Sequence, residues 1–265
     1  MRERAALLLP LAPLVLLIVL LMTGPSARAE LPLAERRSGY DDMRRETRAM
    51  QDDDATNPGM LWVLDGEAAW TARAGAAGKS CADCHGAASA MKGVAARYPA
   101  HDARAGRVLD LEQRINQCRV ERQAAPALAW ESRELLALSA YVGLQSRGLP
   151  IAPPAGAPMD AARERGRALY ERRMGQLNLA CAQCHDQRAG GRLGGATIPQ
   201  GQATGYPIYR LEWQSVGSLQ RRLRNCMAGV RAEPYGFGAA ELIDLEAYLL
   251  WRARGMKLET PAVRP

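Results

Sequence analysis

Two stretches of the chain repeat one pattern of hydrophobic and polar positions. Residues 135–148 read LLALSAYVGLQSRG, and residues 242–255 read LIDLEAYLLWRARG. Apolar residues recur in both at steps of three and four, which places them on one face of an amphipathic helix. Alternation with the two-residue period of a strand is scarce along the chain. The pattern predicts a mainly α-helical protein in which one plan occurs twice.

A proline-rich segment separates the two copies. Four of the ten residues 149–158 are proline and three are alanine. Such a segment cannot continue a helix and is typical of a semi-rigid linker, and a new helix is predicted to begin near Met159. A repeat period near 100 residues indicates duplicated domains rather than a solenoid. We therefore predict two tandem helical domains, residues 30–152 and 153–265.

The first 29 residues have the features of a secretory signal peptide. Arg2 and Arg4 precede an apolar run at residues 5–22, and residues 27–29 (ARA) form a small-x-small cleavage site. A retained membrane anchor is the alternative, although two prolines interrupt the run. We expect cleavage after Ala29, a periplasmic mature protein and no further membrane segment, since no second hydrophobic run is present.

The net charge favours small anions or acidic proteins as partners. The full chain carries +7, and loss of three arginines and one glutamate with residues 1–29 leaves +5. Nucleic acid is not expected as a partner, because no recognition motif accompanies this charge and the protein is exported.

Two CxxCH motifs, at residues 81–85 and 181–185, predict two covalently bound haem c groups. The paired thiols form thioethers with the haem vinyl groups, and the histidine reaches the iron, so His85 and His185 are the predicted proximal ligands. A zinc site would need more ligands, and His101 is the only other histidine. A thioredoxin-type pair would not need the histidines. The predicted attachment cysteines are Cys81, Cys84, Cys181 and Cys184. The fold class is thus two tandem cytochrome-c-like domains.

The sequence offers several candidates for the sixth ligand of each iron. The candidates in the first domain are Met91, His101 and Cys118, and those in the second are Met227, Met256, Lys257 and Cys226. Only Cys118 and Cys226 lie at equivalent places, in the stretches QRINQC and RRLRNC, each four residues after an arginine. We predict that both are distal thiolates. A disulfide between them is the alternative, which the repeat disfavours.

A thiolate ligand would make each haem a poor general electron carrier. An anionic donor stabilises ferric iron and lowers the reduction potential, so the sulfur is expected to take part in chemistry. If Ser218 caps a helix that Gly229 ends, Arg222 and Cys226 share one face at i and i+4. Arg222 could then lower the pKa of the thiol and bind an oxyanion. Further positive charge lies nearby on Arg221, Arg224 and Arg231. A solvated arginine-rich helix face is the alternative.

With these residues in place, the sequence resembles the SoxA family, the catalytic subunit of the SoxAX cytochrome of bacterial sulfur oxidation. The resemblance covers essentially the whole mature chain. The matching stretches are residues 181–185, 205–213 (GYPIYRLEW), 222–226, Arg231 and 245–249 (LEAYL). Some members lack the first haem, whereas this chain keeps Cys81, Cys84 and His85 and is similar to the dihaem form.

The resemblance implies a reaction and its partners. Thiosulfate is joined oxidatively to a cysteine thiol of the carrier SoxYZ, and electrons pass to the haem of a SoxX subunit. In the family, the cysteine matching Cys226 ligates the active-site haem, and the arginine matching Arg222 lies beside it. The first haem, with Cys118, is remote from that centre. An electron-transfer cytochrome without sulfur chemistry is the alternative function, and a haem-based sensor is a third possibility.

Overall fold

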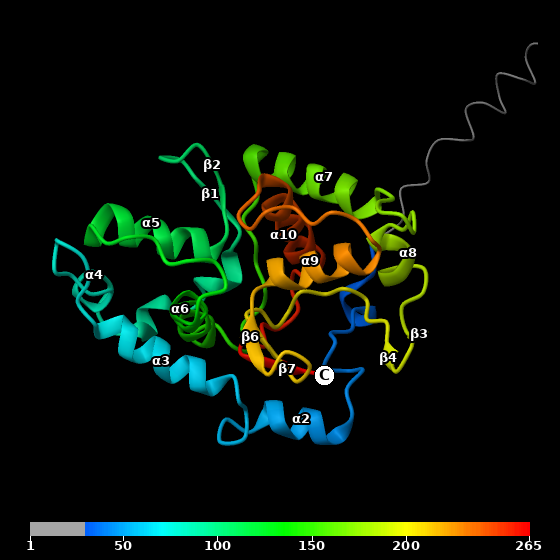
Figure 1. The fold of residues 1–265 in the computed structure, drawn as a ribbon, viewed down its shortest axis with the longest axis horizontal. Helices are drawn as coiled ribbons and strands as arrows, with labels where there is room; N and C mark the ends of the chain where they lie inside the picture. The colour runs from blue at the N-terminus through cyan, green and yellow to red at the C-terminus, as the bar shows by residue number, and fades with distance from the viewer. Residues whose placement is uncertain (1–29) are drawn as a thin grey trace, which may run out of the picture. The chain divides into compact units, whose positions relative to one another are not determined.

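The structure, a computed structural model, describes residues 30–265, so the predicted signal peptide and its cleavage site lie outside the described part. No helix within residues 30–265 is long and apolar enough to cross a membrane. The α-helices are α2 (Arg45–Asp52), α3 (Met60–Thr71), α4 (Ala82–His85), α5 (Leu111–Gln123), α6 (Arg133–Leu144), α7 (Ala157–Glu171), α8 (Cys181–His185), α9 (Leu219–Gly229) and α10 (Ala240–Arg252) (Figure 1). Short 3-10 helices are η1 (Leu33–Glu35), η2 (Ala88–Met91) and η3 (Ala95–Arg97).

The strands are short and subordinate to the helices. They are β1 (Ala100–Asp102), β2 (Arg107–Leu109), β3 (Arg192–Leu193), β4 (Ala196–Thr197), β5 (Ile208–Arg210), β6 (Ser215–Gly217) and β7 (Ala262–Arg264). They form two hairpins, β1–β2 and β3–β4, and one three-stranded sheet of order β6-β5-β7. The predicted mainly α class is therefore confirmed.

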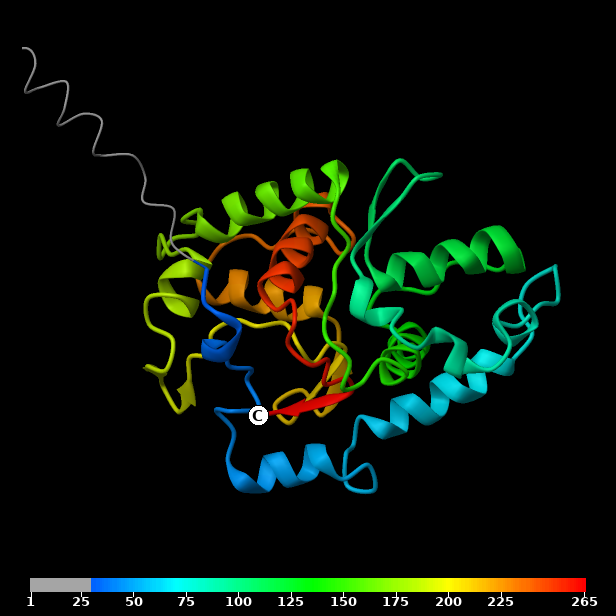
Figure 2. The ribbon, with the colours of Figure 1, turned by 180° about the vertical axis from the view of Figure 1, so that it is seen from behind.

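The predicted duplication is visible as two crossed helix pairs, α3 with α6 and α7 with α10 (Figures 1 and 2). A glycine stands at each crossing. A Cβ on Gly66 would collide with the carbonyl of Ala137, and a Cβ on Gly166 would collide with the carbonyl of Asp244. The two helices of each pair can therefore approach closely only because these positions lack a side chain.

A second correspondence lies just before each CxxCH motif. A single antiparallel bridge joins Ala74 to Lys79 in the first half and Met174 to Leu179 in the second. Each CxxCH motif then begins a single helical turn, α4 or α8, after this narrow loop. The repeat found in the sequence is thus a repeat of backbone structure.

Polar caps fix the starts of the helices that carry Cys118 and Cys226. Asp110 accepts a hydrogen bond of 2.7 Å from the Gln113 amide and forms a capping box at the start of α5. Ser218 Oγ accepts one of 3.1 Å from the Arg221 amide at the start of α9. The predicted cap at Ser218 and the predicted helix end at Gly229 are both confirmed, while α7 begins two residues before Met159.

The proline-rich segment is packed into the protein rather than spanning solvent. Ile151 is 1% exposed and belongs to the hydrophobic core formed around α7, α9 and α10. Its amide donates to Met256 O, and its carbonyl accepts from the Gly255 amide, both at 2.8 Å. The segment therefore runs alongside the chain that follows α10.

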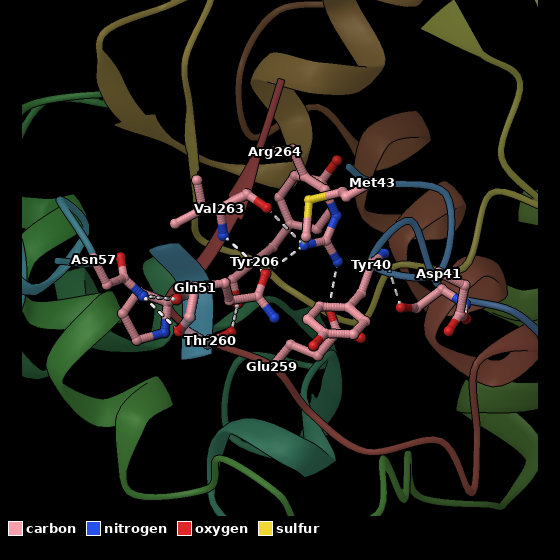
Figure 3. A network of polar contacts seen from close by, with 12 residues as sticks. Tyr40, Asp41, Met43, Gln51, Asn57, Tyr206, Glu259, Thr260, Val263 and Arg264 are labelled. Atoms are coloured by element: carbon pink, nitrogen blue, oxygen red, sulfur yellow. Dashed lines mark hydrogen bonds and ion pairs between the residues drawn. The ribbon is translucent and has the colours of Figure 1, made fainter. Parts of the chain in front are cut away.

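The beginning of the described chain packs on its last strand. Asn57 Nδ2 donates to the carbonyl of Pro261 at 2.9 Å, and the Val263 amide donates to Gln51 Oε1 at 3.0 Å (Figure 3). Gln51 Oε1 also accepts from the guanidinium of Arg264, which pairs with Glu259. Strand β7 in turn pairs in parallel with β5. Residues near 40–57 are thereby held beside the second CxxCH half.

Candidate functional site

A cavity of about 840 Å³ is lined by residues from the second half of the repeat and by residues from the beginning of the described chain, among them Asp42, Met43 and Arg44. Its polar wall includes His185 from α8, Arg210 from β5, and Arg222 and Cys226 from α9. Apolar side chains from α9 and α10 complete it, namely Leu219, Leu223, Leu245 and Leu249. Cys181 lines the cavity as well, whereas Cys184 lies on the same turn of α8 without lining it.

The imidazole of His185 is held in a fixed orientation. Its Nδ1 donates to the carbonyl oxygen of Pro199 at 2.8 Å, so Nε2 is the ring nitrogen that would bind a metal. Gly201 lies against the ring, and a Cβ there would come within 3.2 Å of the ring carbon Cγ. The loop that follows α8 therefore sets both the tautomer and the angle of this histidine.

The short helix α8 is braced by neighbouring helices. Asp186 Oδ1 accepts from Tyr170 Oη of α7 at 2.9 Å and from the guanidinium of Arg252 of α10 at 2.7 Å. Arg252 also lies over the Tyr170 ring, 4.8 Å from its centroid. These contacts fix the turn that carries the attachment cysteines and the histidine.

The residues around this cavity fit a covalently bound haem. A thiol and an imidazole nitrogen come from one helical turn, apolar side chains form the facing wall, and a second sulfur donor lies within the cavity. The other candidate ligands, Met227, Met256 and Lys257, do not line it. Within residues 30–265 no group of three histidine, cysteine or acidic side chains is placed to hold a single metal ion.

The Cys226 thiol lies in an environment that favours the thiolate. Burial alone would raise its pKa, but a hydrogen bond with His185 and the charge of Arg222 outweigh burial, and the pKa lies below its usual value. Arg222 and Cys226 are separated by one turn of α9, as the sequence predicts. This arrangement places a guanidinium beside a nucleophilic sulfur.

The other predicted arginines of α9 lie elsewhere. Arg221 stacks on Trp213, with its guanidinium carbon 4.4 Å from the ring centroid, and Arg224 stacks on Phe237 at 4.4 Å. Neither lines the cavity, and Arg231 does not line it either. The positive charge expected from these three residues is therefore not part of the cavity wall.

Arg210 is a cavity residue whose role the sequence analysis missed. It ends β5, and its side chain is 15% exposed. It belongs to the stretch GYPIYRLEW, but no local pattern relates a strand residue to a helix residue sixteen positions later. The β6-β5-β7 sheet supplies that relation by placing the end of β5 beside α9.

The first CxxCH motif has a different environment. Cys81 is partly buried, while Cys84 and His85 are exposed. The ring of Trp70 lies 5.9 Å from that of His85, and its Nε1 donates to the Gly86 carbonyl at 3.0 Å. Trp70 therefore forms an aromatic wall beside α4 and caps the end of that turn.

Cys118 lies close to this first motif on α5. The charges of Cys84 and Cys118 interact, and burial raises the pKa of Cys118 because Arg114 and Arg122 offset only part of it. Met91 also packs in the apolar cluster next to the motif, so it stays near the site, whereas His101 is exposed on β1. All six cysteines are unpaired in the described chain, and Cys118 and Cys226 lie at different motifs, so the disulfide alternative is not supported.

Comparisons with known proteins agree with this arrangement. The family model for the SoxA/TsdA cytochrome c domain matches twice, at residues 65–151 and 165–258. The L-cysteine S-thiosulfotransferase subunit SoxA of Pseudaminobacter salicylatoxidans is 40% identical over 246 residues, which are 92% of this chain and 86% of that protein. The subunit of the same name from Paracoccus pantotrophus is 33% identical, over 86% and 78% of the two chains. A chain of the crystal structure of SoxXA from P. pantotrophus superposes with a TM-score of 0.84 at 32% identity, covering 87% of each chain.

Proposed function

This chain belongs to the SoxA family of c-type cytochromes, and from that premise we propose that it is the catalytic subunit of an L-cysteine S-thiosulfotransferase. In this proposal it couples thiosulfate oxidatively to a cysteine thiol of a SoxYZ-like carrier protein. The observation that carries the proposal is the pairing of Cys226 with Arg222 in the cavity of the second CxxCH motif. A protein that only transfers electrons has no need of a guanidinium beside a sulfur ligand.

The coupling can be written with atoms and electrons in balance. A carrier thiol and the thiosulfate dianion give the carrier cysteine S-thiosulfonate, one proton and two electrons. The S–H bond of the carrier breaks and a new S–S bond forms to the sulfane sulfur. A haem group, when bound, accepts such electrons one at a time, and the next acceptor is the haem of a SoxX-like subunit.

Residues of this chain have distinct roles in that step. Cys181 and Cys184 would attach the second haem, and His185 and Cys226 would bind its iron. The guanidinium of Arg222 stabilises negative charge on the sulfur of Cys226 and on the bound oxyanion. The low dielectric of the cavity strengthens both contacts.

The first motif completes a dihaem protein. Cys81 and Cys84 would attach the first haem, and His85 and Cys118 would bind its iron. The two haem domains divide in the proline-rich segment, at residues 30–152 and 153–265. The two matches to the family model support this division, although residues 40–57 contact the strand β7 of the second half.

The location and partners follow from the same family. The mature protein is periplasmic, it pairs with a SoxX-like monohaem cytochrome, and its substrates are thiosulfate and the SoxYZ-like carrier. The SoxXA crystal structure that resembles this chain supports the SoxX-like partner. The positive charge of the mature chain suits an anionic substrate.

One assay tests the activity directly. The purified protein, a SoxX-like subunit, the carrier and a ferric cytochrome acceptor are mixed, and acceptor reduction is followed with and without thiosulfate. Thiosulfate-dependent reduction, with the carrier gaining the mass of one thiosulfonate group, is expected. Reduction without carrier modification would identify an electron-transfer cytochrome instead. The mass of the denatured mature chain should equal residues 30–265 plus two haems, and one haem would contradict the dihaem assignment.

A further inference from the structure

The hairpins that precede the two predicted distal cysteines are built to one plan. In the first half, β1 pairs with β2 and ends at Asp102, which faces Arg107. In the second half, β5 pairs with β6 and ends at Arg210, which faces Ser215. Each hairpin leads directly into the helix that carries the cysteine, α5 or α9. Asp102 and Arg210 therefore occupy equivalent positions, 108 residues apart.

The charge at this strand position is reversed between the two halves. Arg114 and Arg222 are also equivalent, one helical turn before Cys118 and Cys226. In the second half the strand residue is an arginine, and it lines the cavity together with Arg222. In the first half it is an aspartate, and Asp102 Oδ2 lies 2.7 Å from Arg114 Nη1. The first pair carries no net charge, whereas the second carries two positive charges.

Arg114 is engaged by the protein on the side of its ion pair. The same nitrogen, Nη1, donates to Gln117 Oε1 at 2.7 Å. The counterpart of Gln117 in the second half, Asn225, is exposed. Arg114 is near enough to Cys118 for its charge to lower the pKa of that thiol, although burial has the larger and opposite effect. An anion approaching Cys118 would have to compete with Asp102 for the guanidinium of Arg114.

The carboxylate of Asp102 is fixed in place and ionised. Its Oδ1 accepts hydrogen bonds from the amides of Arg104 at 2.9 Å and Ala105 at 2.8 Å. These amides and the charge of Arg114 hold the pKa of Asp102 below its usual value. The hairpin itself is anchored, because Val108 packs against the apolar cluster of α7 and α10. Asp102 is therefore a standing negative charge that the fold keeps beside Arg114.

We propose that Asp102 closes the first CxxCH site to sulfur oxyanions by neutralising Arg114, and so confines thiosulfate to the second motif. This inference rests on the proposed function, because it concerns which of the two haem sites takes the substrate. The repeated ligand pattern would otherwise offer thiosulfate a second, unproductive thiolate site. Asp102 acts through Arg114 and is therefore a positioning residue that sets specificity by repulsion.

The number of bound dianions tests this exclusion without turnover. Equilibrium dialysis of the haem-loaded, full mature protein measures radiolabelled sulfate, an unreactive dianion, with no carrier or acceptor present. Asp102→Asn should bind one more sulfate per chain than the unaltered protein, because the affinity at the first motif rises at least about tenfold. Asparagine keeps an oxygen for the two amides that Asp102 Oδ1 accepts, so the hairpin stays folded. Asp102→Arg, which copies the second half, should also gain one sulfate.

Spectroscopy shows where the additional sulfate binds. In a Cys226→Ala background the remaining thiolate-type electron paramagnetic resonance signal belongs to the first haem. Sulfate should leave that signal unchanged when Asp102 is present. When Asp102→Asn is added, sulfate should shift the signal in proportion to the second binding event.

Two controls separate the ion pair from general charge. Glu121→Gln removes one negative charge from α5, and Glu121 lies 3.9 Å from Arg104 rather than on Arg114. Its charge also acts on Cys118. This variant should gain no sulfate. Asp102→Asn combined with Arg114→Gln should lose the additional sulfate again, because the anion then has no guanidinium to bind.

The outcomes separate this inference from the proposed function. An Asp102→Asn protein that binds no more sulfate than the unaltered protein would reject the exclusion. A sulfate gained by Glu121→Gln, or kept in the double variant, would show that Arg114 is not the group that Asp102 controls, and the proposal would be wrong. The expected gain of sulfate, found together with no thiosulfate-dependent turnover in the unaltered protein, would keep the role of Asp102 and reject the coupling activity.

Discussion

The thiols of Cys118 and Cys226 occupy equivalent positions on α5 and α9, yet their pKa values are shifted in opposite directions. Burial raises the pKa of both thiols, but at Cys226 a hydrogen bond with His185 and the charges of Arg222 and Arg210 together outweigh it. The difference arises from neighbours rather than from the helices that carry the thiols. Duplication has therefore kept the ligand position and changed its chemistry in one copy.

Removal of each thiol should separate the two copies functionally. We expect Cys226→Ala to abolish thiosulfate-dependent turnover, because the reactive sulfur is lost, while Cys118→Ala retains most of it. Each variant should lose one low-spin, thiolate-type signal in the electron paramagnetic resonance spectrum of the oxidised protein. Steady-state turnover with the SoxX-like subunit and the carrier provides the measurement. An active Cys226→Ala and an inactive Cys118→Ala would move the catalytic site to the first domain.

The arginine four residues before each cysteine offers a matched pair of variants. Arg222 lines the cavity, whereas Arg114 is 2.7 Å from Asp102 Oδ2 and 2.7 Å from Gln117 Oε1. Arg222→Ala should keep both haems and lower kcat/KM about a hundredfold, the usual cost of one positioned charge at a developing anion. Arg114→Ala should leave turnover near that of the unaltered protein, because its partners satisfy it within the first domain. Equal losses in the two variants would show that the effect of Arg222 is structural.

The features readable from the sequence are those with short-range signals. The CxxCH motifs, the cap at Ser218 and the repeated amphipathic helices each lie within one stretch of chain, and the helices and the cap form where the local pattern places them. Arg222 and Cys226 needed only the helix period to be placed together. The equivalence of Cys118 and Cys226 came from the duplication, because no local pattern connects these two positions.

The structural features that the sequence did not predict depend on contacts between residues distant in the sequence. Arg210 enters the cavity because β5 pairs with β7, whose residues lie some fifty positions later. Arg221 and Arg224 lie outside the cavity because their guanidinium groups stack on the rings of Trp213 and Phe237. The packing of Asn57 on Pro261 likewise has no sequence signal, since an amide can hydrogen bond to any free carbonyl.

The helix crossing of the second half gives a stability prediction. Gly166→Ala adds a methyl group that must meet the Asp244 carbonyl and Tyr248, so α7 and α10 have to separate. We expect a loss of about 2 kcal/mol in the free energy of unfolding, as for overpacked cores. Denaturant titration of the haem-loaded protein measures it. Gly236→Ala is the control, because an added Cβ there meets no atom within 4 Å, and a comparable loss in that variant would refute the crossing argument.

Buried carboxyl groups connect α5, α9 and α10 near the junction of the two halves. Asp110 is 1% exposed and accepts from Gln220 Nε2 at 2.8 Å, while Glu246 of α10 is 7% exposed. Burial and the charges of neighbouring acids raise the pKa of both Asp110 and Glu246 well above their usual values. Burial raises the pKa of Glu112 from 4.5 to about 7, and Glu131 adds to the shift. The folded protein therefore holds protons here that the unfolded chain releases.

The stability of the haem-loaded protein should consequently fall as the pH rises from about 4.5 to about 7, the window set by the pKa of Glu112. Stability falls with rising pH because this carboxyl group has a higher pKa in the folded protein than in the unfolded chain. It stabilises the fold below the unfolded pKa, and that contribution is lost as the group ionises in the folded protein. Glu112→Gln cannot ionise, so at pH 8 it should be about 3 kcal/mol more stable than the unaltered protein, and at pH 4.5 the two should be alike. Guanidinium titrations at both pH values measure the difference, with Glu121→Gln on the exposed face of α5 as the control. A Glu112→Gln protein with the same pH slope as the control would show that Glu112 is ionised throughout and that its burial is compensated by another group.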